Sequence, residues 1–230
     1  MGHKIELLSV VGRDRDGTAL LADLKRAGVG TSHLLVSEAF PTGRYIALED
    51  ETGELIGAIA DCQALDALQA DAFDIEAVAN ADYWFVEANL PTAAIEALAS
   101  VKPRPRLIAN PVSPARAARL QSVLDRIDIL YCNLDEAGAL CGHVFPNTED
   151  AVRALMRQGV RRALVTDGPG SVCDGSPNGI FSVAPDPTGF TSATGAGDVF
   201  LSRHLAAVIA GKDPSSALRA ALANEEKERT

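Results

Sequence analysis

Short apolar runs alternate along this chain with longer segments of helical spacing, and this alternation constrains the fold more than any other feature. Buried strands are expected at 5–11, 83–88, 106–110, 128–133 and 162–168. Helices are expected at 17–28, 92–100, 114–126, 149–159 and 198–211. Such alternation is typical of a parallel sheet whose two faces are covered by helices. We therefore expect an α/β fold with a mostly parallel sheet.

The segment 43–61 does not follow this alternation of strands and helices. It holds two stretches of near-alternating polarity joined by "DETGE", with Gly53 in the turn, and this pattern predicts a β-hairpin. In a parallel α/β chain such a hairpin is an edge ribbon or a flap over a site. We expect one domain over 1–230 that carries this hairpin, and a last helix capped by Asp213 with Pro214 at its first position.

The amino-acid composition and the net charge limit the classes of function that this chain can have. Hydrophobic residues make up 47% of the 230 residues, which is enough to bury a sizeable core, and the net charge is −10. An acidic chain repels nucleic-acid phosphates and anionic lipid, so we expect neither as a partner. The sequence has no apolar run of about 18 residues that could span a bilayer, and its first residues do not resemble a signal peptide.

The four cysteines give no paired metal motif. Cys62, Cys132, Cys141 and Cys173 lack a C-x-x-C spacing, and the nearest metal-like group is Cys132 and Cys141 with His143. We favour buried free thiols in a reducing compartment over that metal site, and so expect a cytoplasmic protein.

The stretch "TSATGAGDVF" places Gly195, Ala196 and Gly197 before Asp198 and an apolar helix. Small residues let a ligand approach the backbone closely, and a helix N-terminus offers N–H donors to a phosphate oxygen. A carboxylate beside a bound phosphate is justified if it accepts a proton from an attacking hydroxyl. Alternatively, Asp198 only complements the helix dipole and the glycines only form a turn.

Two further motifs follow expected strands. "VTDGPGSV" at 165–172 places Gly168 and Gly170 in a tight turn, which is either a ligand-binding strand end or an ordinary strand-to-strand turn. "NLDEAGAL" at 133–140 gathers oxygen donors at a helix start. Asn133 and Glu136 there suit hydrated Mg²⁺, or form a simple helix cap.

The three motifs together are more specific than any one of them, and the sequence resembles the PfkB, or ribokinase, family of carbohydrate kinases. "TGAGDVF" is similar to the C-terminal signature of the family, "NLDE" to its N-x-x-E magnesium motif and "VTDG" to its nucleotide-contacting strand end. "NLP" at 89–91 and "NPVSPARA" at 110–117 look most like the pseudouridine kinase branch.

This resemblance implies a ribokinase-like three-layer α/β/α sandwich with a small β lid at about 43–61. It implies phosphoryl transfer from ATP, with Mg²⁺, to a hydroxymethyl group of a sugar or nucleoside. Asp198 would be the general base, and the N–H groups of Gly195, Ala196 and Gly197 would stabilise the transferring phosphoryl group. Asn133 and Glu136 would position Mg²⁺, and the expected nucleotide contacts are Asn133, Thr166, Gly168, Gly170 and Asn224.

The sequence also departs from the family pattern. Ser192 and Ala193 replace a usual Asp-Thr pair, and Arg203 stands where glycine is usual. The leading strand, first lid strands and glycine-rich sugar-binding helix of the family would precede Met1. From this we expect a homo-oligomer that buries an open strand edge, or a poorly cooperative folder, in which 5–11 is the least protected core strand.

Two alternatives to the kinase are a truncated non-catalytic paralogue that binds nucleotide or a partner chain, and an NAD-dependent oxidoreductase. The second would need G-x-G-x-x-G after the first strand, and "VVGRDRDG" does not supply it.

Overall fold

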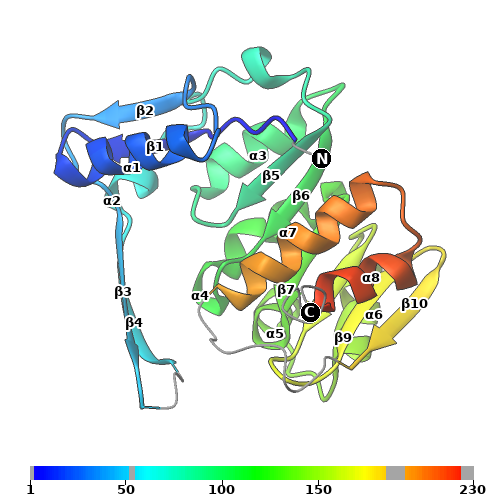
Figure 1. The fold of residues 1–230 in the computed structure, drawn as a ribbon. Helices are drawn as coiled ribbons and strands as arrows, with labels where there is room; N and C mark the ends of the chain where they lie inside the picture. Colours follow the sequence, from blue (N-terminus) through cyan, green and yellow to red (C-terminus); the bar gives the residue numbers. More distant parts are fainter. Residues whose placement is uncertain (1–2, 52–54, 185–194, 224–230) are drawn as a thin grey trace, which may run out of the picture.

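The computed structural model describes residues 3–51, 55–184 and 195–223, and a six-stranded sheet lies at its centre (Figure 1). The strands are β5 (Tyr83–Glu87), β6 (Arg106–Asn110), β7 (Ile129–Asn133), β8 (Ala163–Thr166), β9 (Val172–Ser176) and β10 (Gly179–Val183). Their order in space is β10-β9-β8-β7-β6-β5. Strands β5 to β8 run parallel, whereas β9 and β10 are antiparallel to their neighbours. The expected mostly parallel α/β sheet is confirmed.

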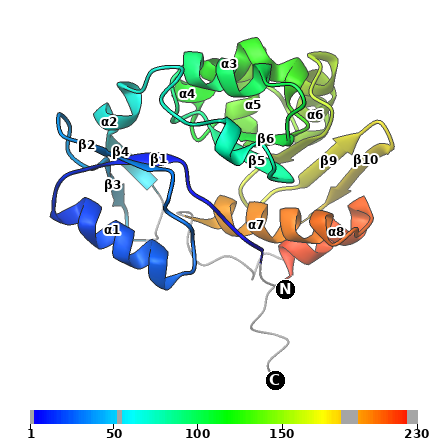
Figure 2. The same cartoon turned by 90° about the horizontal axis from the view of Figure 1, so that it is seen from above.

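Helices cover both faces of this sheet, so the molecule has three layers (Figure 2). One layer holds α3 (Thr92–Ser100), α4 (Pro114–Ala117), the 3₁₀ helix η2 (Ala118–Arg126), α5 (Leu134–Cys141) and α6 (Thr148–Arg157). The other holds α7 (Ala196–Ile209) and α8 (Pro214–Leu222). The helix predicted at 114–126 is therefore two pieces, because α4 gives way to η2 at Ala118.

The strands pack on both faces, which explains their continuous apolar runs. Along β7, Leu130 and Cys132 join the core under α3 to α6, whereas Ile129 and Tyr131 join the core under α7 and α8. Successive side chains of a strand point to opposite faces, so a strand buried on both sides needs apolar residues at almost every position.

The strand predicted at 5–11 differs from expectation. β1 (Ser9–Gly12) is shorter and pairs in parallel with β2 (Leu34–Ser37) across α1 (Arg15–Arg26), in a separate two-stranded sheet. Val10 and Val11 are buried, but Ile5 is 56% exposed. The prediction that 5–11 belongs to the main sheet is wrong, because β1 makes its ladder with β2 and, among the described residues, β5 ends the main sheet.

The predicted hairpin is confirmed. β3 (Arg44–Glu49) and β4 (Leu55–Asp61) are antiparallel, with Ile46 opposite Ile59. This ribbon projects away from the rest of the molecule (Figure 1). The turn that contains Gly53 lies outside the described residues. The chain then returns to the main sheet through α2 (Gln63–Asp66) and the 3₁₀ helix η1 (Glu76–Val78).

The last helix also begins as expected. Asp213 is its N-cap, its side chain accepts a hydrogen bond from the Ser216 N–H, and Pro214 is the first helical residue. Of the helices in the described parts of the chain, none has both the length and the apolar character needed to cross a membrane.

Candidate active site

The carboxyl ends of β7 and β8 bring two of the predicted site residues together. Asn133 is the last residue of β7, and it stands in register with Thr166, the last residue of β8. Parallel strands end at the same edge of a sheet, and ligands of open α/β sheets bind beyond that edge. The predicted magnesium and nucleotide segments are therefore neighbours in space.

Asn133 and Glu136 form a capping box at the start of α5. The Asn133 side-chain oxygen accepts from the Glu136 N–H at 2.8 Å, and the Glu136 carboxylate accepts from the Asn133 N–H at 3.0 Å. Glu136 is only 5% exposed. Burial raises the pKa of its carboxyl; the hydrogen bond from Asn133 lowers it, and the charge of Asp135 raises it further.

The helix-cap alternative at Asn133 and Glu136 is thus what the structure contains. The amide and carboxylate oxygens still suit a hard cation such as Mg²⁺. The Asn133 Oδ1 and Glu136 Oε2 atoms already accept backbone N–H groups, so this donor set fits a hydrated ion better than direct coordination by both residues.

The turn after β8 joins it to the antiparallel β9, so 167–171 is a strand-to-strand turn. The Gly170 N–H donates to the Asp167 carbonyl oxygen at 2.6 Å, and a Cβ at Gly170 would lie 2.8 Å from that oxygen. Gly168 has a φ of +48°, and a Cβ there would meet nothing within 4 Å. Tight turning explains Gly170, whereas the backbone at Gly168 borders open space.

The N-terminus of α7 is formed by the predicted glycine segment. Gly195 is the N-cap with a φ of +84°, which favours glycine, and no side chain caps this end. A Cβ at Gly195 or at Gly197 would meet nothing within 4 Å. Asp198 is in the first turn and its side chain is exposed. The first N–H groups of a helix lack intrahelical acceptors, so this end can receive an anion.

A contact in the middle of α7 shows that this helix packs on β7, and the figures show the direction in which the helix runs. The Tyr131 hydroxyl, two residues before Asn133 on β7, lies 2.8 Å from Nδ1 of His204 on α7. In both views the N-terminal end of α7 lies at the same end of the molecule as α4, which follows the carboxyl end of β6 (Figure 1, Figure 2). The predicted residue Asn224 lies outside the described residues.

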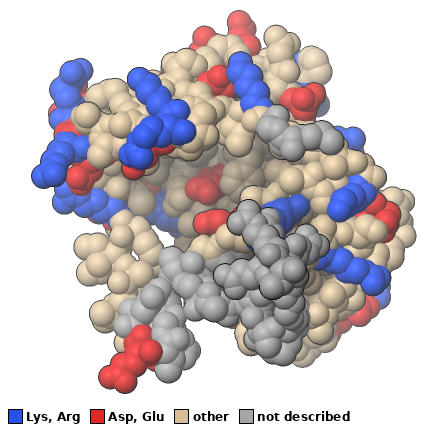
Figure 3. All heavy atoms as spheres, viewed as in Figure 1, with Lys and Arg blue, Asp and Glu red and all other residues tan. Residues whose placement is uncertain are grey.

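Figure 3, drawn in the orientation of Figure 1, shows a hollow near the centre of the molecule with acidic side chains inside it. Within the described ranges no group of three or more His, Cys, Asp or Glu side chains is gathered as a metal cluster. All four cysteines have free thiols; Cys132 and Cys173 are buried, whereas Cys62 and Cys141 are half-buried. Burial raises the pKa of Cys132 and of Cys173. The prediction of free thiols is confirmed, and the prediction of burial is confirmed for Cys132 and Cys173 only.

Sequence reasoning missed two polar clusters. The first joins His204 to Tyr131, Asp174 and Arg162 beneath α7. The only sequence signal was a histidine four residues after Phe200 on an otherwise apolar helix face. The second joins Asp14 to Thr42 at the base of the ribbon, and its two residues lie 28 positions apart, so no local pattern could reveal it.

Comparison with known proteins agrees with this architecture. Residues 1–224 match the family described as pfkB family carbohydrate kinase. The chain is 27% identical over 208 residues to a pseudouridine kinase of Escherichia coli (strain K12), covering 88% of this chain and 66% of that protein.

Solved structures show the same fold. A carbohydrate kinase from Agrobacterium tumefaciens has a TM-score of 0.82 at 28% identity, over 96% of this chain and 73% of that one. A protein from E. coli described as a ribokinase II, solved in complex with ATP and Mg²⁺, has a TM-score of 0.80 at 24% identity, over 96% of this chain and 75% of that one.

The chain spans just under two thirds of the length of the pseudouridine kinase, 66%, and about half, 47%, of a second curated sugar kinase of E. coli. The family match itself extends over nearly all of this chain, and the chain belongs to the pfkB family of carbohydrate kinases, which are phosphotransferases.

Proposed function

We propose that this chain transfers the γ-phosphoryl group of ATP to a hydroxymethyl group of a sugar or nucleoside. One observation carries the proposal. Asn133 and Thr166 end neighbouring strands, and the uncapped N-terminus of α7, with Asp198 in its first turn, lies at the end of the molecule where α4 follows the carboxyl end of β6 (Figure 1, Figure 2). A phosphoryl group held there would face N–H donors on one side and a carboxylate on the other.

Each part has a chemical role in the transfer. The acceptor hydroxyl oxygen forms a bond to the γ-phosphorus while the bond from that phosphorus to the β–γ bridging oxygen breaks. Asp198 accepts the hydroxyl proton, and the N–H groups at Gly195, Ala196 and Gly197 stabilise the charge of the phosphoryl group. Such positioned donors contribute about 10²–10³-fold in rate each.

Asn133 and Glu136 would hold Mg²⁺ through water, and the ion would neutralise charge on the phosphate oxygens. Thr166, Gly168 and Gly170 would border the nucleotide, and Asn224 would extend that contact. The open space in front of Gly168 is consistent with a nucleotide passing close to the backbone there. The pseudouridine kinase relative favours a ribosyl acceptor.

The test is a transfer assay with Mg-ATP and a panel of ribosyl nucleosides, including pseudouridine, and free sugars. We expect a phosphomonoester and ADP in equal amounts by ³¹P NMR. A 5′-deoxy analogue of the best acceptor lacks the hydroxyl and should give no product. Binding of Mg-ATP without transfer to any acceptor would contradict the kinase proposal and support the non-catalytic alternative.

A further inference from the structure

A buried polar cluster lies between α7 and the sheet. It consists of Tyr131 on β7, Arg162 just before β8, Asp174 on β9 and His204 on α7. The Arg162 Nε donates to Asp174 Oδ1 at 2.8 Å, and the Tyr131 hydroxyl is 2.8 Å from His204 Nδ1. His204 Nε2 lies 3.5 Å from Asp174 Oδ2 and 3.4 Å from Arg162 Nη2.

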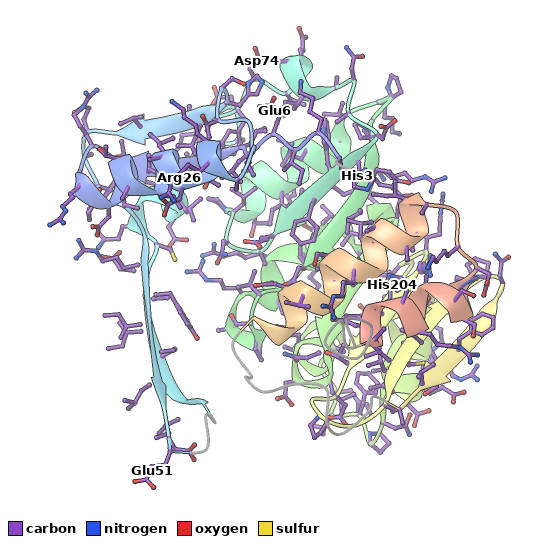
Figure 4. The ribbon with its side chains drawn as sticks, in the orientation of Figure 1. His3, Glu6, Arg26, Glu51, Asp74 and His204 are labelled. Atoms are coloured by element: carbon purple, nitrogen blue, oxygen red, sulfur yellow. The ribbon has the colours of Figure 1, made fainter. Side chains whose placement is uncertain are left out.

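Three of the four side chains of this cluster are as buried as the apolar core around them, and the Arg162 side chain is 16% exposed. His204 is 0% exposed, Asp174 1% and Tyr131 3%. The remaining side chains of this core are apolar, and Phe200 stacks on the His204 ring with centroids 5.9 Å apart. His204, labelled on α7 in Figure 4, extends toward the strands rather than toward solvent, because it is fully buried and its ring contacts Tyr131 on β7.

Electrostatics hold the cluster in one ionisation state. Burial lowers the pKa of His204, although the hydrogen bond and charge of Asp174 oppose this, and so favours the neutral imidazole. Burial works to raise the pKa of Asp174, but the hydrogen bonds from Arg162 and His204 and the Arg162 charge keep it below its usual value. Asp174 therefore remains an anion that accepts hydrogen bonds from Arg162 and His204.

Such a cluster is a poor way to gain stability, because apolar residues of similar size often serve as well in a core. Hydrogen bonds are directional, so they hold the helix in one defined position on the sheet. Apolar contacts alone allow the helix to slide and rotate slightly on the sheet. His204 lies six residues after Asp198, about 9 Å along a rigid helix. Tyr131 lies two residues before Asn133.

We propose that His204 is a positioning residue that fixes the first turn of α7 relative to the end of β7. This role of His204 rests on the proposed function, in which Asp198 and Asn133 act on the same phosphoryl group. Catalytic groups must be held within about 0.5 Å of their productive geometry, and a misplacement of about 1 Å can cost about 10²-fold in rate. The Tyr131–His204 hydrogen bond links the two elements directly.

Three variants test this. His204→Leu removes both ring nitrogens, His204→Asn keeps a hydrogen-bonding group near the position of Nδ1, and Tyr131→Phe removes only the hydroxyl. We expect His204→Leu and Tyr131→Phe to lower kcat by about 10-fold or more with little change in KM for ATP. His204→Asn should restore most of the loss. Leu155→Ala, at a fully buried site on α6, is the control for loss of core packing.

A second readout does not depend on turnover. The Val199 N–H is the first in α7 to donate within the helix, to the Gly195 carbonyl oxygen at 3.0 Å, so amide protection can be followed from residue 199 onward. Amide hydrogen exchange at 199–202 should rise in His204→Leu and Tyr131→Phe, but not in Leu155→Ala at the same distance below its melting temperature. An unchanged exchange rate at 199–202 in both cluster variants would overturn the proposal, as would a kcat loss equal to that of the control. If the parent transfers nothing, the proposed function fails, and the exchange experiment still decides the role of His204.

Discussion

At the residue scale, Asp198 carries the most specific prediction. Asp198→Asn should lower kcat by about 10²–10⁴-fold, because the amide cannot accept the proton of the attacking hydroxyl. The KM for ATP should change little, because the N–H donors of α7 remain. Steady-state kinetics with the best acceptor measures both values.

Asp150→Asn is the matched control. Asp150 also lies exposed in a first turn, that of α6, so this variant changes the charge and the helix-dipole interaction in the same way. We expect its kcat to stay within about twofold of the parent. Asp198→Asn with a rate equal to that of the control would show that Asp198 only complements the helix dipole.

At the element scale, the capping box at α5 allows two roles of Asn133 to be separated. Asn133→Ala should cost about 0.5–2 kcal/mol of stability, and Asn133→Ser should cost little, because serine also caps helices. If the amide also holds hydrated Mg²⁺, both variants should need about 10-fold more Mg²⁺ for half-maximal rate. If Asn133→Ser showed the same Mg²⁺ dependence as the parent, Asn133 would act only as a helix cap and not as a magnesium ligand.

The base of the ribbon is fixed by Asp14. Its carboxylate accepts from the N–H of Gly17 at 2.8 Å, from the N–H of Thr42 at 2.8 Å and from the Thr42 hydroxyl at 2.7 Å. The Gly17 and Thr42 hydrogen bonds lower the pKa of Asp14 from 3.8 to about 2. The Gly12 N–H donates in turn to the Thr42 hydroxyl oxygen at 3.0 Å, so β1, α1 and the start of the ribbon meet at one point.

This shift predicts an acid dependence of stability with a defined sign. Because the folded pKa is the lower one, the stabilisation is complete above pH 3.8 and is lost as the pH falls toward about 2. In acid titrations followed by circular dichroism, the parent should lose stability more steeply over that range than Asp14→Asn. Thr42→Val should move the pKa of Asp14 upward by NMR. Parallel titration curves for parent and Asp14→Asn would contradict the assignment.

Sequence pattern predicted the elements whose apolar runs are uninterrupted, and missed those with breaking residues. β6, β7 and β8 lie where their runs placed them. β9 and β10 were missed because "VCDGSPNGIFSV" carries Asp174 and several turn residues. Asp174 is tolerated in a buried strand because Arg162 and His204, which come from other segments of the chain, stabilise its carboxylate. Contacts of this kind depend on tertiary structure, so local pattern cannot reveal them.

The residues of the candidate site were likewise predictable where they belong to a local pattern, and not where they depend on tertiary contacts. Asn133, Glu136 and the glycines before Asp198 could be recognised because each belongs to a contiguous motif. His204 could not, because its partners come from three other segments of the chain.

At the scale of the whole molecule, the ribbon presents an apolar face that no other described element covers. Ile46, Leu48 and Ile59 lie on one face of β3 and β4 and are 63%, 61% and 72% exposed. In Figure 4 the ribbon side chains stand clear of the body, with Glu51 at the far end. A two-stranded ribbon is marginal alone in water, and such exposed faces favour association.

We therefore expect the chain to form dimers or larger assemblies at micromolar concentration, measured by size exclusion with light scattering. The double variant Ile46→Thr with Ile59→Thr keeps β-propensity and removes apolar surface, so it should shift the chain toward monomer. A parent that stays monomeric at every concentration tested would show that the ribbon face does not drive association.

The separate two-stranded sheet leads to the last expectation, which concerns cooperativity. In the described part of the chain, β1 pairs with β2 alone, whereas β8 lies between β7 and β9 with Leu164 and Val165 fully buried. Segments with fewer hydrogen-bonded neighbours and less buried apolar contact open at lower free energy. Amides of 9–12 should therefore exchange faster than those of 163–166 in native-state hydrogen exchange. Equal protection of both strands would mean that a further segment, or a second copy of the chain, pairs with the open edge of β1, and a concentration series would separate these two cases because only the second depends on concentration.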